Sequence, residues 1–261
     1  MQIRMDGRSA LITGGSRGLG RAMALKFAQA GAKVAILARR AEVLDGTKRE
    51  IEAAAPGAKV KACPCDVSEA GQIQEAYQAV VRDFGQVDIL VNNAGTSVRG
   101  KFEELTDEVW LSDFNLKLFA AIRLCRLALP GMKERRWGRI INVLNTAAKA
   151  PAGEGAPTAV TRAAGMAMTK VLSKEGAPHN VLVNALCVGR FVTDQWLGHH
   201  KRQAPEKTFE QYMRDMGKTI PLGRVGDAEE FANVACFLAS DAGSYVTGVA
   251  INVDGGASPV V

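Results

Sequence analysis

The sequence has no run of 18 consecutive uncharged apolar residues, the length that a helix needs to cross a bilayer. It also lacks a basic stripe, because its 33 Lys and Arg residues are scattered and the only dense run, at 199–202, is short. The net charge of +6 therefore does not predict a nucleic-acid surface. These absences lead us to expect a soluble, cytoplasmic protein that has neither a membrane nor a nucleic acid as its partner.

Paired cysteines are missing as well. The chain has five cysteines, an odd number, and contains no C-x-x-C unit. Cys63 and Cys65 have no further Cys or His at the spacing of zinc ligands. We expect reduced, mostly buried thiols and no metal site.

The chain does contain a regular alternation of short apolar runs with helix-length amphipathic stretches. The apolar runs suit buried strands and span residues 9–13, 33–38, 59–63, 87–91, 139–144, 181–187 and 249–253. Crossover helices between parallel strands cover both faces of a sheet. With 261 residues and 47% hydrophobic content, the sequence predicts a single α/β domain over 1–261, with a doubly wound parallel sheet of about seven strands.

Local signals mark two helix starts, and one long segment breaks the alternation. Small polar residues followed by acidic ones predict helix starts at Ser68 and Thr106. Residues 190–226 are polar and irregular, with aromatic and methionine residues spaced through them. Long segments of this kind usually serve function, so we predict a mobile substrate lid; a helical decoration or a subunit contact is the alternative.

A glycine-rich loop, Thr13 to Gly20, follows the first predicted strand. Its glycines let backbone N–H groups approach a pyrophosphate, and a helix that begins near Gly18 adds partial positive charge. This placement predicts a Rossmann-type dinucleotide site. The expected contacts are Gly14, Ser16, Arg17, Gly18, Leu19 and Gly20.

The second predicted strand ends without the Asp or Glu that accepts hydrogen bonds from the adenosine ribose in NAD-binding folds. It ends instead in Arg39 and Arg40. Arg39 and Arg17 can both reach a 2′-phosphate, whose geometry matches a guanidinium fork. The sequence therefore predicts NADP(H) as the cofactor. The alternative is that Arg39 and Arg40 are solvated residues at the start of the next helix.

Further motifs follow in a fixed order, and each could be a turn or a cap if it stood alone. They are Cys65-Asp66-Val67, Asn92-Asn93-Ala94-Gly95, Phe114-Asn115-Leu116-Lys117, and the segments 223–230, 237–241 and 253–256. With the glycine loop, they make the chain resemble the short-chain dehydrogenase/reductase family nearly end to end.

The resemblance implies the remaining cofactor contacts, an assembly and a type of ligand. The implied contacts are Asp66 and Val67 at the adenine, then Asn93, Ala94, Gly95, Arg162, Gly189 and Thr193. The family's usual assembly implies a homotetramer or homodimer. Its usual chemistry implies a small-molecule substrate.

The family's proton-transfer positions hold other residues in this chain. The family places an Asn in mid-helix, a Ser after the fifth strand and, thirteen residues on, a Tyr-x-x-x-Lys. The matching positions here are Asn115, Asn145, Thr158 and Arg162. No tyrosine lies near them, because the chain has only Tyr77, Tyr212 and Tyr245.

These replacements change the acid step more than cofactor binding. Arg162 can still hydrogen-bond ribose hydroxyls and supply a fixed positive charge. The aliphatic hydroxyl of Thr158 is too weak an acid to do the work of a tyrosine phenol. Thr158 and Asn145 can still donate hydrogen bonds to a carbonyl or enolate oxygen. Other titratable candidates, more often solvated than catalytic, are Lys149, Glu154, Asp194, His199 and His200.

Together these features favour an NADP(H)-dependent oxidoreductase with a non-standard proton path. Its substrate would be a carbonyl, an alcohol or an activated double bond. Two alternatives stay open: a non-redox lyase, dehydratase or isomerase, and a cofactor-bound sensor without turnover.

Overall fold

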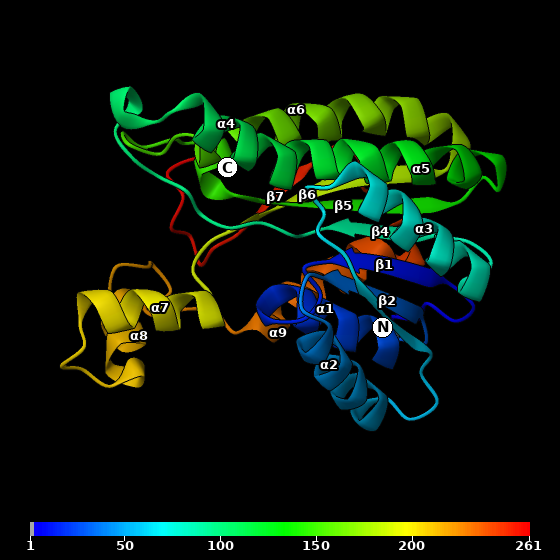
Figure 1. Cartoon of the computed structure of the whole chain (residues 1–261), viewed down its shortest axis with the longest axis horizontal. Helices are drawn as coiled ribbons and strands as arrows, with labels where there is room; N and C mark the ends of the chain where they lie inside the picture. Colours follow the sequence, from blue (N-terminus) through cyan, green and yellow to red (C-terminus); the bar gives the residue numbers. More distant parts are fainter. Residues whose placement is uncertain (1–2) are drawn as a thin grey trace.

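Seven parallel strands form the central sheet, in the order β3-β2-β1-β4-β5-β6-β7 (Figure 1). The computed structural model describes residues 3–261, apart from the side chain of Gln195. The strands are β1 (Ser9–Thr13), β2 (Lys33–Ala38), β3 (Val60–Pro64), β4 (Ile89–Asn92), β5 (Gly138–Asn145), β6 (Val181–Val188) and β7 (Ala250–Val253). The predicted doubly wound parallel sheet is confirmed.

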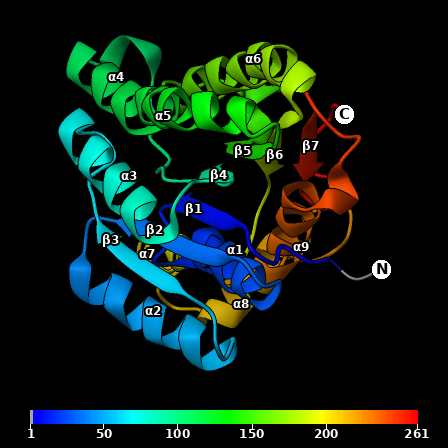
Figure 2. The ribbon, with the colours of Figure 1, turned by 90° about the vertical axis from the view of Figure 1, so that its right-hand side faces the viewer.

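Helices cover both faces of the sheet (Figure 2). One face carries α1 (Gly18–Gln29), α2 (Ala41–Ala54) and α9 (Ala228–Ala239). The other carries α3 (Ala70–Phe84), α5 (Ala120–Glu134) and α6 (Thr158–Gly176). The short helix α4 (Asp107–Phe114) runs through a π-helical turn, Asn115–Phe119, into α5. Such turns widen a helix locally and are frequent at functional sites.

Apolar side chains of the strands make the core, which explains why the strands are visible in the sequence as continuous apolar runs. Leu11, Ile12, Ile36, Leu37 and Ile89 are all fully buried. All five cysteines are buried, as expected, and none is paired with another. No helix within residues 3–261 is both long and apolar enough to cross a membrane.

The segment 190–226 differs from the irregular loop that the sequence predicts. It contains two helices, α7 (Asp194–Gln203) and α8 (Phe209–Gly217), which lie together to one side of the sheet in Figure 1. Their apolar side chains pack on one another around Met213, Ile220 and Val225. Mutual packing of two short helices therefore gives order to a segment whose composition is mostly polar.

Helices begin close to the two predicted starts, at Ala70 and Asp107. Glu69 and Thr106 occupy the positions before α3 and α4, and neither side chain caps the first turn of its helix with a hydrogen bond. Because all strands are parallel, their carboxyl ends meet at one edge of the sheet. The predicted cofactor and catalytic residues follow those ends, as ligand sites do in this class of fold.

Candidate active site

The glycine loop between β1 and α1 has a backbone shape that depends on its glycines. Gly14 and Gly18 have φ angles of 64° and 51°, in the left-handed region that favours glycine. A Cβ atom at Gly20 would overlap the carbonyl oxygen of Gly14 and lie 2.6 Å from Nδ2 of Asn93. Arg17 precedes α1 without a capping side-chain bond, so the first N–H groups of the helix stay available to an anion.

The turn after β4 is tied to this loop by hydrogen bonds. The hydroxyl oxygen of Thr13 accepts from the N–H groups of Asn93, at 2.9 Å, and Ala94, at 3.0 Å. Asn93 Nδ2 donates to the carbonyl oxygen of Thr13 at 2.8 Å. The structure therefore brings Gly14, Gly20 and Asn93 together, as the sequence predicts for one continuous cofactor site.

The adenosine end of the predicted site is basic and exposed. Arg39 follows β2, and its charge contributes to a lowered pKa at Asp66. The larger cause of that lowered pKa is Ser68, whose hydroxyl donates to Asp66 Oδ1 at 2.6 Å. Arg17 lies 3.6 Å from Asp194 of α7, an ion pair that links the loop to the segment 190–226. Arg40 precedes α2 and makes no capping bond with its side chain.

Gly189 and Thr193 lie on the chain that leads from β6 into α7. A Cβ atom at Gly189 would lie 2.5 Å from Cα of Asp254, so the backbones approach too closely for a side chain. Thr193 precedes α7, and its Cγ2 would lie 3.4 Å from a Cβ atom at Gly18. Thr193 thus lies close to the glycine loop, and its contact with a cofactor stays a prediction.

The four predicted catalytic positions lie on three elements. Asn115 begins the π-helical turn, and its Oδ1 accepts from Arg123 Nη2 at 3.4 Å. Asn145 ends β5, and its buried Oδ1 has no hydrogen-bond partner among the described residues. Thr158 is the first residue of α6 and is 3% exposed. Arg162, one turn on, donates from Nη1 to the carbonyl oxygen of Val143 at 2.7 Å.

Arg162 closes the space between α6 and the turn after β4. A Cβ atom at Gly95 would lie 2.5 Å from Arg162 Nη2 and 3.5 Å from Lys117 Cγ. The half-buried guanidinium has its pKa lowered to about 10 by burial, which Asp113 opposes. Arg162 therefore keeps its charge at neutral pH.

Three polar residues without a role in the sequence interpretation surround Thr158. Lys117 donates from Nζ to Thr158 Oγ1 at 2.7 Å and also to Asp113 Oδ1. Thr161 Oγ1 donates to Asp113 Oδ2 at 2.6 Å. The side chains of Lys117 and Asp113 are 1% and 0% exposed. We call Asp113, Lys117, Thr158 and Thr161 the buried quartet.

Within the buried quartet, Lys117 is the residue whose pKa departs clearly from its ordinary value. Burial lowers its pKa to about 8, and the hydrogen bond that Lys117 donates to Asp113 opposes this change. The positive charge of Arg162 lowers the pKa further. An ammonium with a pKa near neutrality is suited to proton transfer. Its sequence signal, an Asp and a Lys four residues apart, more often marks an exposed helical ion pair.

The other titratable candidates do not join the quartet by any hydrogen bond within residues 3–261. Lys149 Nζ donates to the carbonyl oxygen of Ala250 at 2.6 Å, and Glu154 is exposed. The ring of His199 lies 5.1 Å from that of Trp196. His200 Nε2 lies 2.7 Å from the carbonyl oxygen of Lys207.

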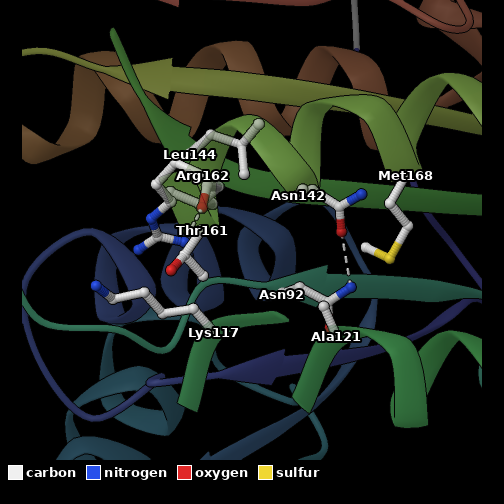
Figure 3. Close-up of a pocket in the computed structure, with 10 residues that line it drawn as sticks. Asn92, Lys117, Ala121, Asn142, Leu144, Thr161, Arg162 and Met168 are labelled. Carbon is white, nitrogen blue, oxygen red and sulfur yellow. Dashed lines mark hydrogen bonds between the residues drawn. The ribbon is translucent and has the colours of Figure 1, made fainter. Parts of the chain in front are cut away.

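A small polar cavity lies beside the quartet (Figure 3). Its volume is about 10 Å³, close to the space that one water needs. In its lining, Asn92 Nδ2 donates to Asn142 Oδ1 at 2.8 Å, and Asn142 Nδ2 also donates to Thr169 Oγ1 at 2.8 Å. Figure 3 shows Lys117, Thr161 and Arg162 at one end of this cavity, and Asn92, Asn142 and Met168 at the other.

Comparisons with known proteins agree with this geometry. A family model described as enoyl-(acyl carrier protein) reductase matches residues 14–258. The chain is 36% identical to the 3-oxoacyl-(acyl-carrier-protein) reductase FabG of Thermotoga maritima, over 97% of this chain and 99% of that protein.

Solved structures resemble the whole chain as well. The L-sorbose reductase of Gluconobacter frateurii, solved with NADPH and L-sorbose, has a TM-score of 0.95 and 32% identity over 100% of both chains. A short chain oxidoreductase of Pseudomonas aeruginosa PAO1 that contains an atypical catalytic center has a TM-score of 0.92 and 34% identity, over 99% of this chain and 100% of that one. The chain belongs to the short-chain dehydrogenase/reductase family of NAD(P)-dependent oxidoreductases.

Proposed function

We propose that this protein is an NADP(H)-dependent reductase that acts on a carbonyl or an activated double bond through a non-standard proton-transfer site. The observation that carries the proposal is the complete glycine cradle between β1 and α1, with Arg17 and Arg39 beside it and no acid at the end of β2. NADPH in the solved L-sorbose reductase supports the same cofactor here.

Each part of the cradle has a proposed role in holding NADP(H). The N–H groups at the start of α1 bind the pyrophosphate, and Arg39 with Arg17 binds the 2′-phosphate. Asp66 and Val67 border the adenine, while Asn93, Ala94 and Gly95 border the far half of the cofactor. The cofactor supplies hydride when it is bound. The chain's own residues must then place the substrate and deliver a proton.

Arg162 is proposed to hold the nicotinamide ribose. Its Nη1 is held by Val143 and its Nη2 lies against Gly95, so the guanidinium is fixed between β5 and the turn after β4. Asn145 and Thr158 are proposed to donate hydrogen bonds to the substrate oxygen. A donor aimed at developing negative charge is worth about 10²- to 10³-fold in rate.

The pair α7–α8 is proposed to cover the substrate. The ion pair between Arg17 and Asp194 connects this lid to the phosphate loop, so cofactor binding at the loop would bias its position. Because the lid's aromatic residues pack on one another, they offer less apolar surface to a substrate than the sequence implied. NADPH-dependent protection of residues 194–217 from hydrogen exchange tests this role.

Self-association is proposed through the helices on the α5–α6 side. Leu111, Phe119, Val160 and Val171 are 43–60% exposed there and would supply apolar surface to a contact between subunits. Light scattering of the purified protein distinguishes a tetramer or dimer from a monomer.

Two substitutions test the proposed function. Thr158→Ala removes a hydrogen-bond donor to the substrate, whereas Arg162→Ala removes a cofactor ligand. We expect Arg162→Ala to weaken NADPH binding and Thr158→Ala to leave it unchanged while slowing turnover. Product formed without change in the cofactor would instead favour the non-redox alternative. Tight NADPH binding without consumption of any ketone, enal or enoyl thioester would favour a sensor.

A further inference from the structure

The hydroxyl of Thr158 has an unused proton. Its oxygen accepts two hydrogen bonds, from Lys117 Nζ at 2.7 Å and from the N–H of Val98 at 3.0 Å. A hydroxyl oxygen has two lone pairs and one hydrogen, so both acceptor positions are filled. Within residues 3–261 that hydrogen has no acceptor. Thr158 is therefore prepared to donate to a group outside the protein.

Lys117 is charged in this arrangement and cannot accept the proton of Thr158. An ammonium has three donors and no acceptor, and Lys117 uses two of them on Thr158 and Asp113. A buried ion pair contributes little to stability compared with apolar residues of similar volume. The second contact of the ammonium, on a hydroxyl at the substrate position, therefore points to a role beyond packing.

We propose that Lys117 is the proton source for carbonyl reduction and that the Thr158 hydroxyl relays its proton to the substrate oxygen. The proposal rests on the proposed function and names the missing acid of that site. In this relay the Thr158 hydroxyl lies between Lys117 Nζ and the substrate oxygen, so Lys117 acts through Thr158.

In the proposed relay, the bonds formed and broken balance within a single step. Hydride adds to the carbonyl carbon, the C–O π bond breaks, and its electron pair passes to oxygen. That oxygen takes the proton of Thr158 Oγ1, while Thr158 Oγ1 takes a proton from Lys117 Nζ. Thr158 ends as it began, the product is an alcohol, and Lys117 is left as a neutral amine. The acid strength is then that of an ammonium, so the weak acidity of an aliphatic hydroxyl is no obstacle.

The surroundings of Lys117 suit this role. Asp113 from α4 favours the ammonium, whereas burial and the charge of Arg162 from α6 favour the amine. The balance brings the pKa of Lys117 to about 8, where the group gives up a proton far more readily than an exposed lysine. After turnover the amine regains a proton from water. The polar cavity at its side has about the room that one water needs (Figure 3).

The first test measures Lys117 directly in the protein without cofactor. In protein labelled with carbon-13 at lysine Cε, we expect one lysine signal to titrate near pH 8. Lys117→Met should remove that signal, and Asp113→Asn should move its titration to lower pH. Lys48→Met, on the exposed side of α2, is the matched control and should leave it in place. A Lys117 signal that titrates with the exposed lysines overturns the proposal.

The second test measures NADPH-dependent reduction of L-sorbose, 2,3-butanedione and an acetoacetyl thioester between pH 6 and 10. For the wild-type protein, kcat/KM should be constant below the pKa of Lys117 and fall about tenfold per pH unit above it. Lys117→Met should lower kcat/KM about 10²- to 10⁴-fold and remove this fall. The affinity for NADPH should be unchanged.

Because Lys117→Met leaves Asp113 buried without its partner, three further variants serve as controls for misfolding. The double variant Asp113→Asn with Lys117→Met removes both charges. Thr158→Val keeps the shape of the side chain but removes the relay, whereas Thr158→Ser keeps a hydroxyl and should keep the pH-dependent step. Circular dichroism and NADPH affinity establish that each variant is folded.

The outcomes separate the two proposals. If wild-type protein reduces a carbonyl and the Lys117 and Thr158→Val variants keep its rate and pH profile, the relay is wrong and the proposed function stands. If wild-type protein binds NADPH and reduces none of the three carbonyls, the proposed function fails and the relay fails with it. Loss of rate and of the pH profile with unchanged NADPH affinity supports both.

Discussion

Arg162 Nη1 donates a hydrogen bond to the carbonyl oxygen of Val143 at 2.7 Å, which ties the first turn of α6 to β5. The bond fixes the guanidinium of Arg162 between these two elements. It leaves Nη2 facing the turn that contains Gly95. The charge of Arg162 is thereby held at one place, and this is the physical basis for its proposed contact with the cofactor ribose.

Substitution of Arg162 should damage cofactor binding. A hydrogen bond to a charged group contributes about 1.5–3 kcal/mol, so Arg162→Ala should weaken NADPH binding about 10- to 100-fold. Arg162→Lys keeps the charge and should lose less. Fluorescence titration of bound NADPH measures both variants. Equal affinity of Arg162→Ala and wild type would contradict the ribose contact.

Adding one methyl group at Gly20 should disrupt the phosphate loop. The new Cβ atom would overlap the carbonyl oxygen of Gly14, and backbone cannot yield as a flexible side chain does. We expect Gly20→Ala to lower NADPH affinity and thermal stability together. Gly46→Ala in α2 is the matched control, because a Cβ atom there meets nothing within 4 Å. It should stabilise the helix by about 0.5–1 kcal/mol. Wild-type NADPH affinity in Gly20→Ala would argue against this loop as the pyrophosphate site.

Arg39 should determine the choice between NADPH and NADH. Arg39→Ala removes a donor to the 2′-phosphate, so the affinity for NADPH should fall about 10-fold or more while that for NADH changes little. Arg49→Ala, on the exposed surface of α2, is the control. Equal losses for both cofactors would show that Arg39 acts on the fold and not on the phosphate.

The buried quartet makes stability depend on pH in a defined direction. The pKa of Lys117 is about 8 in the folded chain, below its ordinary 10.5, because burial disfavours the charge. Between these two values the unfolded chain binds more protons than the folded chain, so the free energy of unfolding rises with pH. The slope approaches about 1.4 kcal/mol per pH unit.

Urea unfolding of wild type and Lys117→Met at pH 7.5–10.5 measures this dependence as a difference between the two proteins. The free energy of unfolding of wild type, minus that of Lys117→Met, should increase as the pH rises. Exposed lysines cancel in the comparison, since both proteins share them. A difference that does not change with pH would mean that Lys117 keeps its ordinary pKa.

The sequence predicts the sheet well because its strands are buried on both faces and therefore appear as apolar runs. The loop from Thr13 to Gly20 is equally clear, since its glycines have conformations or close approaches that other residues do not tolerate. Helices in segment 190–226 are only the alternative that the sequence offers, because packing between α7 and α8, and not their polar composition, gives them order.

Residue patterns in the sequence do not predict the buried quartet either. Asp113 and Lys117 are four residues apart, a spacing typical of exposed helical pairs. Their burial depends on how α6 packs against the π-helical turn, which no local pattern reports. The short hydroxyl side chain of Thr158, on α6, accepts the hydrogen bond that Lys117 donates from the π-helical turn.

The central claim is that this chain passes hydride from NADPH to a substrate. Its most direct test is reduction of the carbonyl and enoyl panel with NADPH deuterated at either face of C4, followed by mass spectrometry of the product. The account predicts one deuterium per product molecule from one of the two labelled cofactors, with one NADPH consumed for each product. Product that carries no deuterium from either cofactor, or bound NADPH that is never consumed, would contradict it.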